Sequence, residues 1–263
     1  MSAYNAIQNK LRKKILELHY GANAGHIGCS LSCIDILIAT LIGRKTEKDI
    51  FLLSKGHAAS ALYSSLNHLG EISDEDLKTY YKNGTALPAH PAALKFKGIP
   101  FATGSLGHGF PIGTGISLGS KLSGGGGYTY VVMSDGETNE GTTWEAAHFA
   151  VKHQLNNIIV IIDNNGLQGF GEINEVIGNT SDSSKWQAIG FETAVVDGHN
   201  IEAIQHAIDS FKKSENNRPK VLIAQTVKGK GVSFMENKLE WHYQPMTEEL
   251  YQHAQKEITE KYS

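Results

Sequence analysis

Residues 128–136 read YTYVVMSDG, and residues 157–165 read NIIVIIDNN. Each segment is a run of apolar, mostly β-branched residues that stops at small polar ones, which predicts two buried strands. Residues 144–151 between them have the apolar spacing of an amphipathic helix. This order predicts a βαβ unit with parallel strands. Its right-handed crossover would place Asp135 and Asn165 in one crevice at the carboxyl edge of the sheet.

Asp135 and Asn165 carry oxygen atoms of the kind that Mg²⁺ or Ca²⁺ prefers. A protein commonly gives Mg²⁺ few ligands, because a bound diphosphate supplies others, so these two side chains and one loop carbonyl would suffice. Gly136 lets the backbone approach a bulky anion without a Cβ in the way. The segment therefore predicts a metal and diphosphate site. An ordinary strand, turn and helix, in which Asp and Asn only form turns, remains open on these residues alone.

The rest of the chain continues the alternation of helices and strands. Apolar spacing predicts helices at 6–19, 30–41, 59–69 and 201–212, and strands at 51–53, 192–196 and 221–225. This pattern predicts one α/β domain over residues 1–263, with a doubly wound, mainly parallel sheet and helices on both faces. Residues 83–103 are rich in Pro and Gly, which predicts a long loop with a functional role. The tail at about 233–263, helical near its end, is expected to dock on the domain or on a partner.

The composition excludes several classes of protein. A net charge of −3 gives no reason to expect a nucleic-acid partner, and the longest apolar stretch, residues 34–42, is too short to span a membrane. The two cysteines, Cys29 and Cys33, are expected to be buried small hydrophobes, and so few cysteines fit the cytoplasm. Only three arginines are present, so few groups suit a bidentate sugar-phosphate clamp.

Short histidine-containing segments surround the predicted site. They are GHIG at 25–28, SKGHA at 54–58, LPAHP at 87–91 and EWHY at 240–243, together with TGSLGHG at 103–109 and DGETNEG at 135–141. Each histidine alone is as compatible with a surface or structural role as with catalysis. Together, in this order, the segments resemble those of transketolases over nearly the whole chain. The sequence looks most like the amino-terminal subunit of two-chain transketolases.

The resemblance implies thiamine diphosphate as the cofactor, because an acidic-glycine pair followed 30 positions later by Asn165 resembles its binding motif. It implies catalytic roles for His26, His57, His90, His242 and Glu140, with His242 donating to the forming alkoxide and Glu140 facing the other chain. It implies cofactor contacts from Gly104, Leu106, Asp135, Gly136, Asn165 and His57. The metal ligands would be Asp135, Asn165 and the carbonyl of Leu167.

The resemblance also implies a transketolase activity shared between two chains. A two-carbon ketol unit would pass from a ketose donor to an aldose acceptor, either of them a sugar, a sugar phosphate or a nucleotide-linked sugar. Family members activate the aminopyrimidine with a glutamate from a pyrimidine-binding domain, and the tail of this chain leaves no room for one. A second polypeptide carrying that domain is therefore expected, in a heterotetramer with two copies of each chain.

Three alternatives remain open on the sequence. The alpha subunit of 2-oxo acid dehydrogenases uses a similar cofactor motif, but the segments around His26, His57 and His90 speak against it. A nicotinamide-dependent dehydrogenase is suggested by glycines at 107–115, which do not open a first βα unit. A non-enzymatic module that kept the fold is the third.

Overall fold

Five parallel strands form one sheet in the computed structural model, which describes residues 3–93 and 95–262. They are β1 (Ile50–Leu53), β2 (Thr129–Ser134), β3 (Ile158–Asn164), β4 (Glu192–Asp197) and β5 (Lys220–Gln225), in the spatial order β1-β2-β3-β5-β4. Ser134 lies opposite Asp163 in the register, so β2 and β3 end at nearly the same level. The predicted strands and their parallel arrangement are confirmed. Met1, Ser2, Leu94 and Ser263 of the predicted domain lie outside the described residues.

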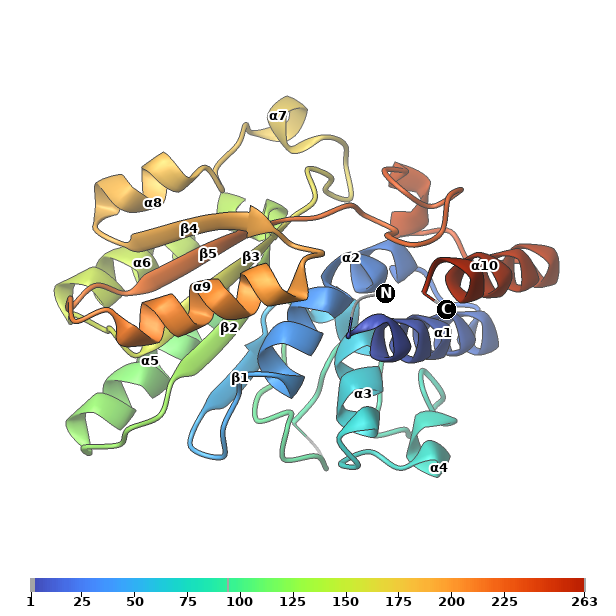
Figure 1. Cartoon of the computed structure of the whole chain (residues 1–263), viewed down its shortest axis with the longest axis horizontal. Helices are drawn as coiled ribbons and strands as arrows, with labels where there is room; N and C mark the ends of the chain where they lie inside the picture. The colour runs from blue at the N-terminus through green and yellow to red at the C-terminus, as the bar shows by residue number, and fades with distance from the viewer. Residues whose placement is uncertain (1–2, 94, 263) are drawn as a thin grey trace.

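The sheet is covered on both faces, as predicted (Figure 1). Successive strand residues point to opposite sides, so β1, β2, β3 and β5 each contribute to two separate apolar clusters. Leu52, Val131 and Val160 belong to the cluster under α5 (Gly109–Leu122), α6 (Gly141–Lys152) and α8 (Ser183–Ile189). Phe51, Val132 and Ile161 belong to the cluster under α2 (Ile27–Leu37), α3 (Ala59–His68) and α9 (Ile201–Lys213). Because both faces of the sheet are buried, its central strands have nearly continuous apolar sequences.

The remaining helical elements are shorter or lie outside these layers. They are α1 (Asn5–Ala22), α4 (Asp74–Leu77), α7 (Ile173–Val176), α10 (Glu248–Lys261), a π-helical turn at Ile38–Ile42, and 3₁₀ turns at Gly56–Ala58, Gly136–Asn139 and Leu239–His242. The helix predicted at 30–41 begins earlier, at Ile27, and its last turn is π-helical. In that turn the Thr40 hydroxyl donates to the Ile36 carbonyl at 2.6 Å, so a side chain competes for a backbone acceptor.

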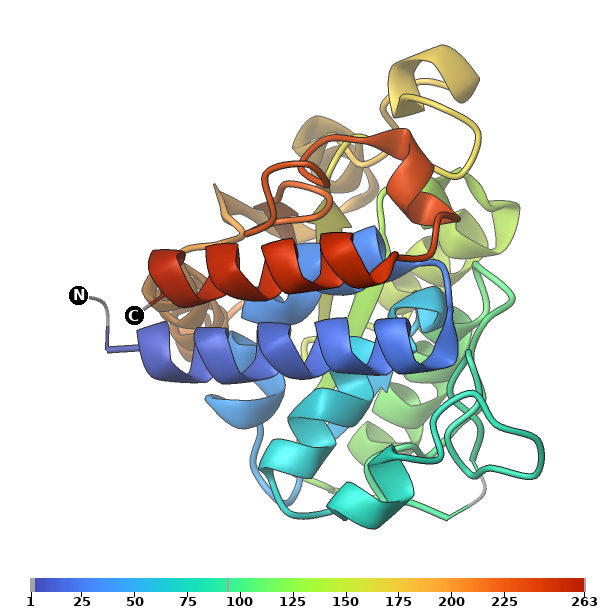
Figure 2. The same cartoon turned by 90° about the vertical axis from the view of Figure 1, so that its right-hand side faces the viewer.

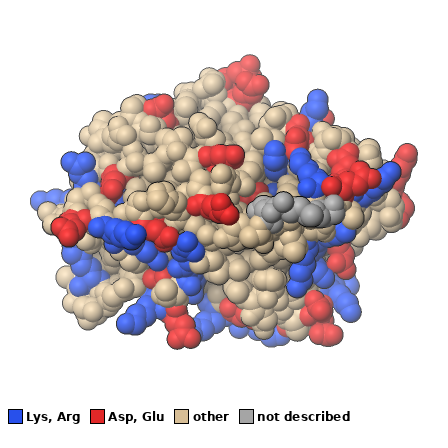
Figure 3. All heavy atoms as spheres, viewed as in Figure 1, with Lys and Arg blue, Asp and Glu red and all other residues tan. Residues whose placement is uncertain are grey.

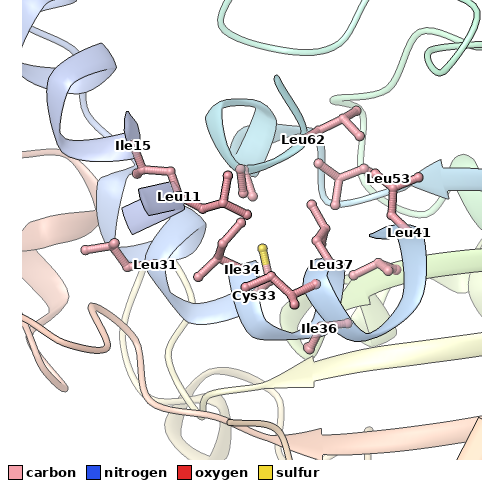
Figure 4. Close-up of a cluster of buried hydrophobic side chains, with 14 of the residues drawn as sticks. Leu11, Ile15, Leu31, Cys33, Ile34, Ile36, Leu37, Leu41, Leu53 and Leu62 are labelled. Carbon is pink, nitrogen blue, oxygen red and sulfur yellow. The ribbon is translucent and has the colours of Figure 1, made fainter. Parts of the chain in front are cut away.

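The apolar cluster beneath α1, α2 and α3 holds the amino-terminal part of the molecule together (Figure 4). Leu11 and Ile15 of α1 point towards Ile34 and Leu37 of α2 in this view, with Leu53 of β1 at the far side. All five side chains are at most 3% exposed. This core fixes the start of α2, where His26 lies, relative to the end of β1, which carries the segment with His57.

The carboxyl-terminal helix α10 packs on α1 of the same domain (Figure 2). The two helices run side by side in opposite directions, so the start of α1 lies near the end of α10. Ala254 and Ile258 are buried, and the rings of Tyr20 and Tyr251 stack with centroids 4.4 Å apart. The contact fixes α10 on the amino-terminal helix of the domain.

A fully buried ion pair crosses the interior between α1 and α2. The Arg12 guanidinium donates to both carboxylate oxygens of Asp35, at 2.9 and 2.6 Å, and both side chains are 0% exposed. Asp35 also accepts from Gln8 Nε2 at 2.9 Å and pairs with His199 Nδ1 at 2.8 Å. Burial works against the ionised carboxylate, but Arg12 and His199 hold the pKa of Asp35 well below its usual range. The network therefore stabilises the ionised form of Asp35 beside the charged Arg12.

We expect Asp35→Ala to lower the free energy of unfolding by about 3–5 kcal/mol, because it leaves the Arg12 guanidinium buried without a counter-charge. Urea denaturation followed by circular dichroism measures the change. The matched control is Asp209→Ala, which breaks the partly exposed pair with Arg44 and should cost about 0–1 kcal/mol. Equal costs for the two variants would contradict the prediction.

Candidate active site

A cavity of about 500 Å³ opens at the carboxyl edge of the sheet. It is lined by every residue predicted for the site: His26, His57, His90, Gly104, Leu106, Asp135, Gly136, Glu140, Asn165, Leu167 and His242. These residues come from the start of α2, from the segments after β1, β2 and β3, from the loop before α5 and from the segment before α10. A second cavity of about 480 Å³, beside Lys14 and Tyr80, contains none of them. The structure thus brings the predicted residues together at one place.

Asp135 and Asn165 face each other across the ends of β2 and β3. The Asp135 carboxylate accepts from the backbone N–H groups of Gly136 at 2.7 Å and Gly166 at 2.6 Å. Asn165 donates its Nδ2 to Ser32 at 3.2 Å, and its Oδ1 accepts from the Leu167 N–H at 3.0 Å. This orientation turns the amide oxygen towards the loop that carries the Leu167 carbonyl. The three predicted metal ligands therefore lie on one short stretch of the cavity wall.

The protonation of Asp135 is sensitive to what binds beside it. Burial raises the pKa of this carboxyl to about 6, the nearby Asp163 carboxylate acts in the same direction, and the N–H groups of Gly166 and Gly136 oppose the rise. A cation on these oxygens would favour the ionised form. Among the described residues, no group of three or more His, Cys, Asp or Glu side chains is arranged to hold a metal ion. A metal here would depend on one carboxylate, an amide, a carbonyl and the ligand's own oxygens.

Four histidine rings gather in the wall of the cavity. The ring centroid of His26 lies 5.8 Å from that of His57, 6.0 Å from that of His90 and 5.0 Å from that of His242. Burial lowers the pKa values of His26, His57 and His242 to about 4, and neighbouring cationic groups add to the effect. Burial also lowers the pKa of His90. Neutral imidazoles can both donate and accept hydrogen bonds, so this wall suits a ligand rich in hydroxyl groups.

The His26 backbone is held in an unusual conformation. Its φ is 68°, in the left-handed region that few residues other than glycine adopt, and its N–H donates to the His242 carbonyl at 2.9 Å. A Cβ on Gly25 would lie 2.7 Å from the Tyr243 carbonyl oxygen, so only glycine allows this approach. The contact joins the start of α2 to the segment before α10 and places His26 beside His242. Strained backbone of this kind is typical of functional sites.

Glycines in the loop before α5 permit close contacts with neighbouring segments. Gly104 has a φ of 149°, and a Cβ there would meet the His90 ring at 3.1 Å. A Cβ on Gly107 would lie 2.6 Å from Cβ of Glu140, which is exposed at the start of α6. The Gly107 N–H donates to the buried Glu137 carboxylate at 2.9 Å. Glu137, which the sequence did not single out, thereby ties this loop to the end of β2.

A buried ionic network lies under the cavity and was also missed by sequence reasoning. The Lys55 ammonium pairs with the Asp163 carboxylate, and both side chains are 0% exposed. Asp163 also accepts from the hydroxyls of Ser32, at 2.7 Å, and Thr226. Ser32 in turn receives the Asn165 amide. The network connects the ends of β1, β3 and β5 with α2 and fixes the orientation of Asn165. The only signal in the sequence is that these polar residues follow or end apolar strands.

The two cysteines are both buried, as predicted, but their surroundings differ. Burial raises the pKa of the Cys33 thiol to about 12, within the apolar core. Cys29 lines the cavity, with its Sγ 3.7 Å from His242 Nδ1. Burial alone would raise the pKa of Cys29, but the Lys228 ammonium and other cationic neighbours outweigh it and lower the value to about 7. The prediction that both cysteines are simple hydrophobes therefore misses the polar environment of Cys29.

The described part of the chain has no arginine in the cavity wall, in line with the sequence. Arg12 is engaged by Asp35, Arg44 pairs with Asp209, and Arg218 is exposed elsewhere. Lys and Arg side chains are interspersed with Asp and Glu over the face drawn in Figure 3. No helix among residues 3–93 and 95–262 combines the length and apolar character needed to cross a membrane.

Comparison with known families gives a match over nearly the whole chain. Residues 5–261 match the model of the transketolase, thiamine diphosphate binding domain. The chain is 38% identical over 261 residues to one of the subunits of the apulose-4-phosphate transketolase of Phocaeicola vulgatus, covering 96% of this chain and 92% of that protein. It is 35% identical over 259 residues to a 6-deoxy-6-sulfo-D-fructose transketolase subunit of a Clostridium species, covering 95% of this chain and 94% of that protein.

Solved structures of similar fold include transketolases from three organisms. The Leishmania mexicana enzyme superposes with a TM-score of 0.88 at 25% identity, over 100% of this chain and 41% of that one. A Pichia stipitis variant gives 0.89 at 28% identity with the same coverage. The Campylobacter jejuni enzyme gives a TM-score of 0.87 at 29% identity, over 97% of this chain and 42% of that one. The chain thus spans about two fifths of the length of these solved structures.

Proposed function

Because the chain belongs to the transketolase family through its thiamine diphosphate binding domain, we propose that it is the amino-terminal, diphosphate-binding subunit of a two-chain transketolase. The observation that carries the proposal is the single cavity shared by Asp135, Asn165 and the four histidines. The family assignment argues against the 2-oxo acid dehydrogenase and nicotinamide alternatives raised by the sequence. The non-enzymatic alternative is tested by the activity measurements below.

The cavity suits the diphosphate end of thiamine diphosphate. Asn139 Nδ2 and Gln168 Nε2 are buried without a hydrogen-bond partner among the described residues, and both residues line the cavity. Phosphate oxygens would satisfy such donors. Backbone N–H groups at the start of the turn after β2 add further partial positive charge. We assign Gly104, Leu106, Gly136 and His57 to the cofactor contacts, because each lines the same cavity.

Asp135, Asn165 and the Leu167 carbonyl would hold Mg²⁺ or Ca²⁺ between the protein and the diphosphate. These are hard oxygen donors, and three of them leave positions for phosphate oxygens and water. The lysines that line or adjoin the cavity, Lys55 and Lys228, are engaged with Asp163 and with His242. A metal ion would therefore supply the neutralising charge on the side of Asp135.

When bound, thiamine diphosphate would supply the chemistry for breaking and forming the carbon–carbon bond in the transfer of a two-carbon unit from a ketose to an aldehyde. The chain's own contribution is to orient the sugar and to move protons. His26, His57 and His90 present neutral rings to the sugar hydroxyls, and His242 donates to the oxygen that becomes an alkoxide. These rings place no fixed charge beside the thiazolium cation, which a protonated histidine would repel.

The names of the relatives suggest the class of substrate and the need for a partner. The Phocaeicola relative belongs to a transketolase named for apulose 4-phosphate, and the Clostridium relative to one named for a sulfonated fructose. We infer a ketose or ketose-ester donor for this chain and a second polypeptide that carries the pyrimidine-binding domain, in a heterotetramer with two copies of each. Glu140 is exposed at the cavity rim, where it would face that partner. The small and apolar surface at 104–122 would be covered as well.

Replacing His26, His57 or His90 by alanine should lower turnover by about 10²–10⁴-fold without preventing cofactor binding, because each ring acts on the sugar or its protons. Steady-state kinetics of the assembled complex give the turnover, and calorimetry gives the cofactor affinity. His206→Ala, on an exposed position of α9, is the matched control and should change neither value. If the three variants lost their folded circular dichroism signal, the histidines would be structural instead.

A further inference from the structure

Lys228 is a fully buried lysine without an acidic partner. Its side chain is 0% exposed, and no carboxylate among the described residues forms an ion pair with it. Its ammonium instead contacts His242 Nδ1 at 2.9 Å and the Leu167 carbonyl at 3.4 Å. Burying an ammonium is costly unless it is paired or hydrogen-bonded. With no carboxylate beside it, the Lys228 ammonium is held by these two contacts.

The backbone around Lys228 fixes the position of its side chain. The Lys228 carbonyl accepts from the Asn237 N–H at 2.9 Å, and the next N–H, of Gly229, donates to the Gly28 carbonyl at 3.0 Å. A Cβ on Gly28 would lie 3.2 Å from Lys228 Cγ and 3.1 Å from the Trp241 carbonyl oxygen. The chain therefore holds the lysine stem, the start of α2 and the His242 segment in one tightly packed arrangement.

The contact between Lys228 and His242 determines where the imidazole carries its proton. An ammonium group has donors and no acceptor, so His242 Nδ1 must accept the hydrogen bond and cannot itself carry hydrogen. A doubly protonated ring would place two donors head to head at 2.9 Å. The remaining proton is thus on Nε2, which makes no hydrogen bond with the described residues. This nitrogen faces Gly169 in the cavity wall, where an added Cβ would lie 3.3 Å from it.

Other groups that face the His242 ring do not compete for this role. Cys29 Sγ lies farther from Nδ1, at 3.7 Å. The rings of His26, His57 and Tyr243 pack beside the imidazole, with centroids 5.0, 5.8 and 4.6 Å away. Ring stacking restricts the tilt of the imidazole but not its tautomer. Within the described part of the chain, the Lys228 ammonium is the group that selects between the two nitrogens.

We propose that Lys228 is a positioning residue that fixes His242 as the Nε2–H tautomer and aims this N–H into the cavity. The inference rests on the proposed function, in which His242 donates to the substrate oxygen. Through its second contact, Lys228 also links His242 to the loop of Leu167. The donor is thereby aligned with the loop that would hold the cofactor's metal.

The tautomer can be observed directly by ¹⁵N NMR of the full chain labelled at histidine, because protonated and unprotonated ring nitrogens have well-separated chemical shifts. His242→Asn identifies the His242 signals. We expect Nε2–H in the native chain, a mixture of tautomers in Lys228→Met, and the native pattern in Lys228→Arg, which retains donors only. Lys230→Met, a change in the same loop whose side chain pairs with Glu236 instead, is the control. An unchanged Nε2–H tautomer in folded Lys228→Met would overturn the proposal.

Kinetics of the chain with its partner test the consequence. Lys228→Met should lower kcat at least about 10-fold, because the His242 N–H is no longer oriented, and KM for the ketose should change less. Lys228→Arg should keep most of the native kcat. Thiamine diphosphate affinity measured alongside separates this effect from lost cofactor. A changed tautomer with unchanged turnover would contradict the donor role of His242 in the proposed function, and an unchanged tautomer would contradict the role of Lys228. The two failures are therefore distinguishable.

Discussion

Asp135→Ala is expected to weaken thiamine diphosphate binding in the presence of Mg²⁺ by at least about 100-fold. Titration calorimetry would then detect no binding of the cofactor. The change removes the one carboxylate among the three proposed metal ligands. It also leaves the N–H groups of Gly136 and Gly166 without their acceptor at the end of β2. Asn165→Ala should have a smaller effect, because it removes a neutral oxygen. Titration calorimetry with Mg²⁺ and the cofactor measures both.

The matched control for Asp135→Ala is Asp209→Ala, which removes a carboxylate on α9 that pairs with Arg44 away from the cavity. Its cofactor affinity should equal that of the native chain. Asp135→Asn adds a second test, because it keeps the shape and one acceptor oxygen but removes the charge. Native affinity in both Asp135 variants would show that the metal is held elsewhere.

The purified chain alone should show no transketolase turnover, and adding the partner should restore it. The cavity wall offers histidines and an exposed Glu140, but its rim also exposes Phe170 and Ile177, which are 87% and 67% accessible. Exposed apolar side chains beside a site indicate a surface that another chain covers. Without that chain the cofactor's pyrimidine end would stay in water, with no partner carboxylate to promote loss of the thiazolium proton.

Ketose-donor cleavage with thiamine diphosphate and Mg²⁺ is the deciding measurement. It should be made on the highly purified chain and again after addition of the partner, with size-exclusion chromatography to follow assembly. Phe170→Ser should weaken assembly, whereas Phe149→Ser, on the outer side of α6 and 38% exposed, serves as a comparison for any exposed apolar change. Full turnover by the chain alone would overturn the two-chain proposal.

Those parts of the fold that depend on local sequence were predictable. The strands that end just before Asp135 and Asn165 are predicted by continuous apolar runs, and parallel pairing places their ends together whatever the side chains are. The segments of His26, His57, His90 and His242 were identified by their residues, and the structure places them around one cavity. The helix boundaries were less accurate: α2 begins at Ile27 rather than residue 30, and its pattern continues into a π-helical turn at Ile38–Ile42.

What the sequence did not predict are the contacts between distant polar residues. Lys55 and Asp163 are 108 positions apart, and Ser54 and Glu137 are 83 apart. Each residue read alone resembles a surface or turn residue, because polar side chains are usually exposed. Their burial follows only from the order in which the strands assemble into the sheet. The role of Lys228 was missed for the same reason, since it depends on a contact with His242 in another segment.

The antiparallel contact between α1 and α10 has a consequence for synthesis of the protein on the ribosome. α1 emerges well before α10, so the contact between these two helices forms only after α10 has been synthesised. Until then, Tyr20 of α1 lacks the Tyr251 ring that stacks on it. The nascent chain can form its sheet while translation continues. Its cavity is completed only after the segment with His242 has also emerged, so the sheet can form before the wall that carries this histidine.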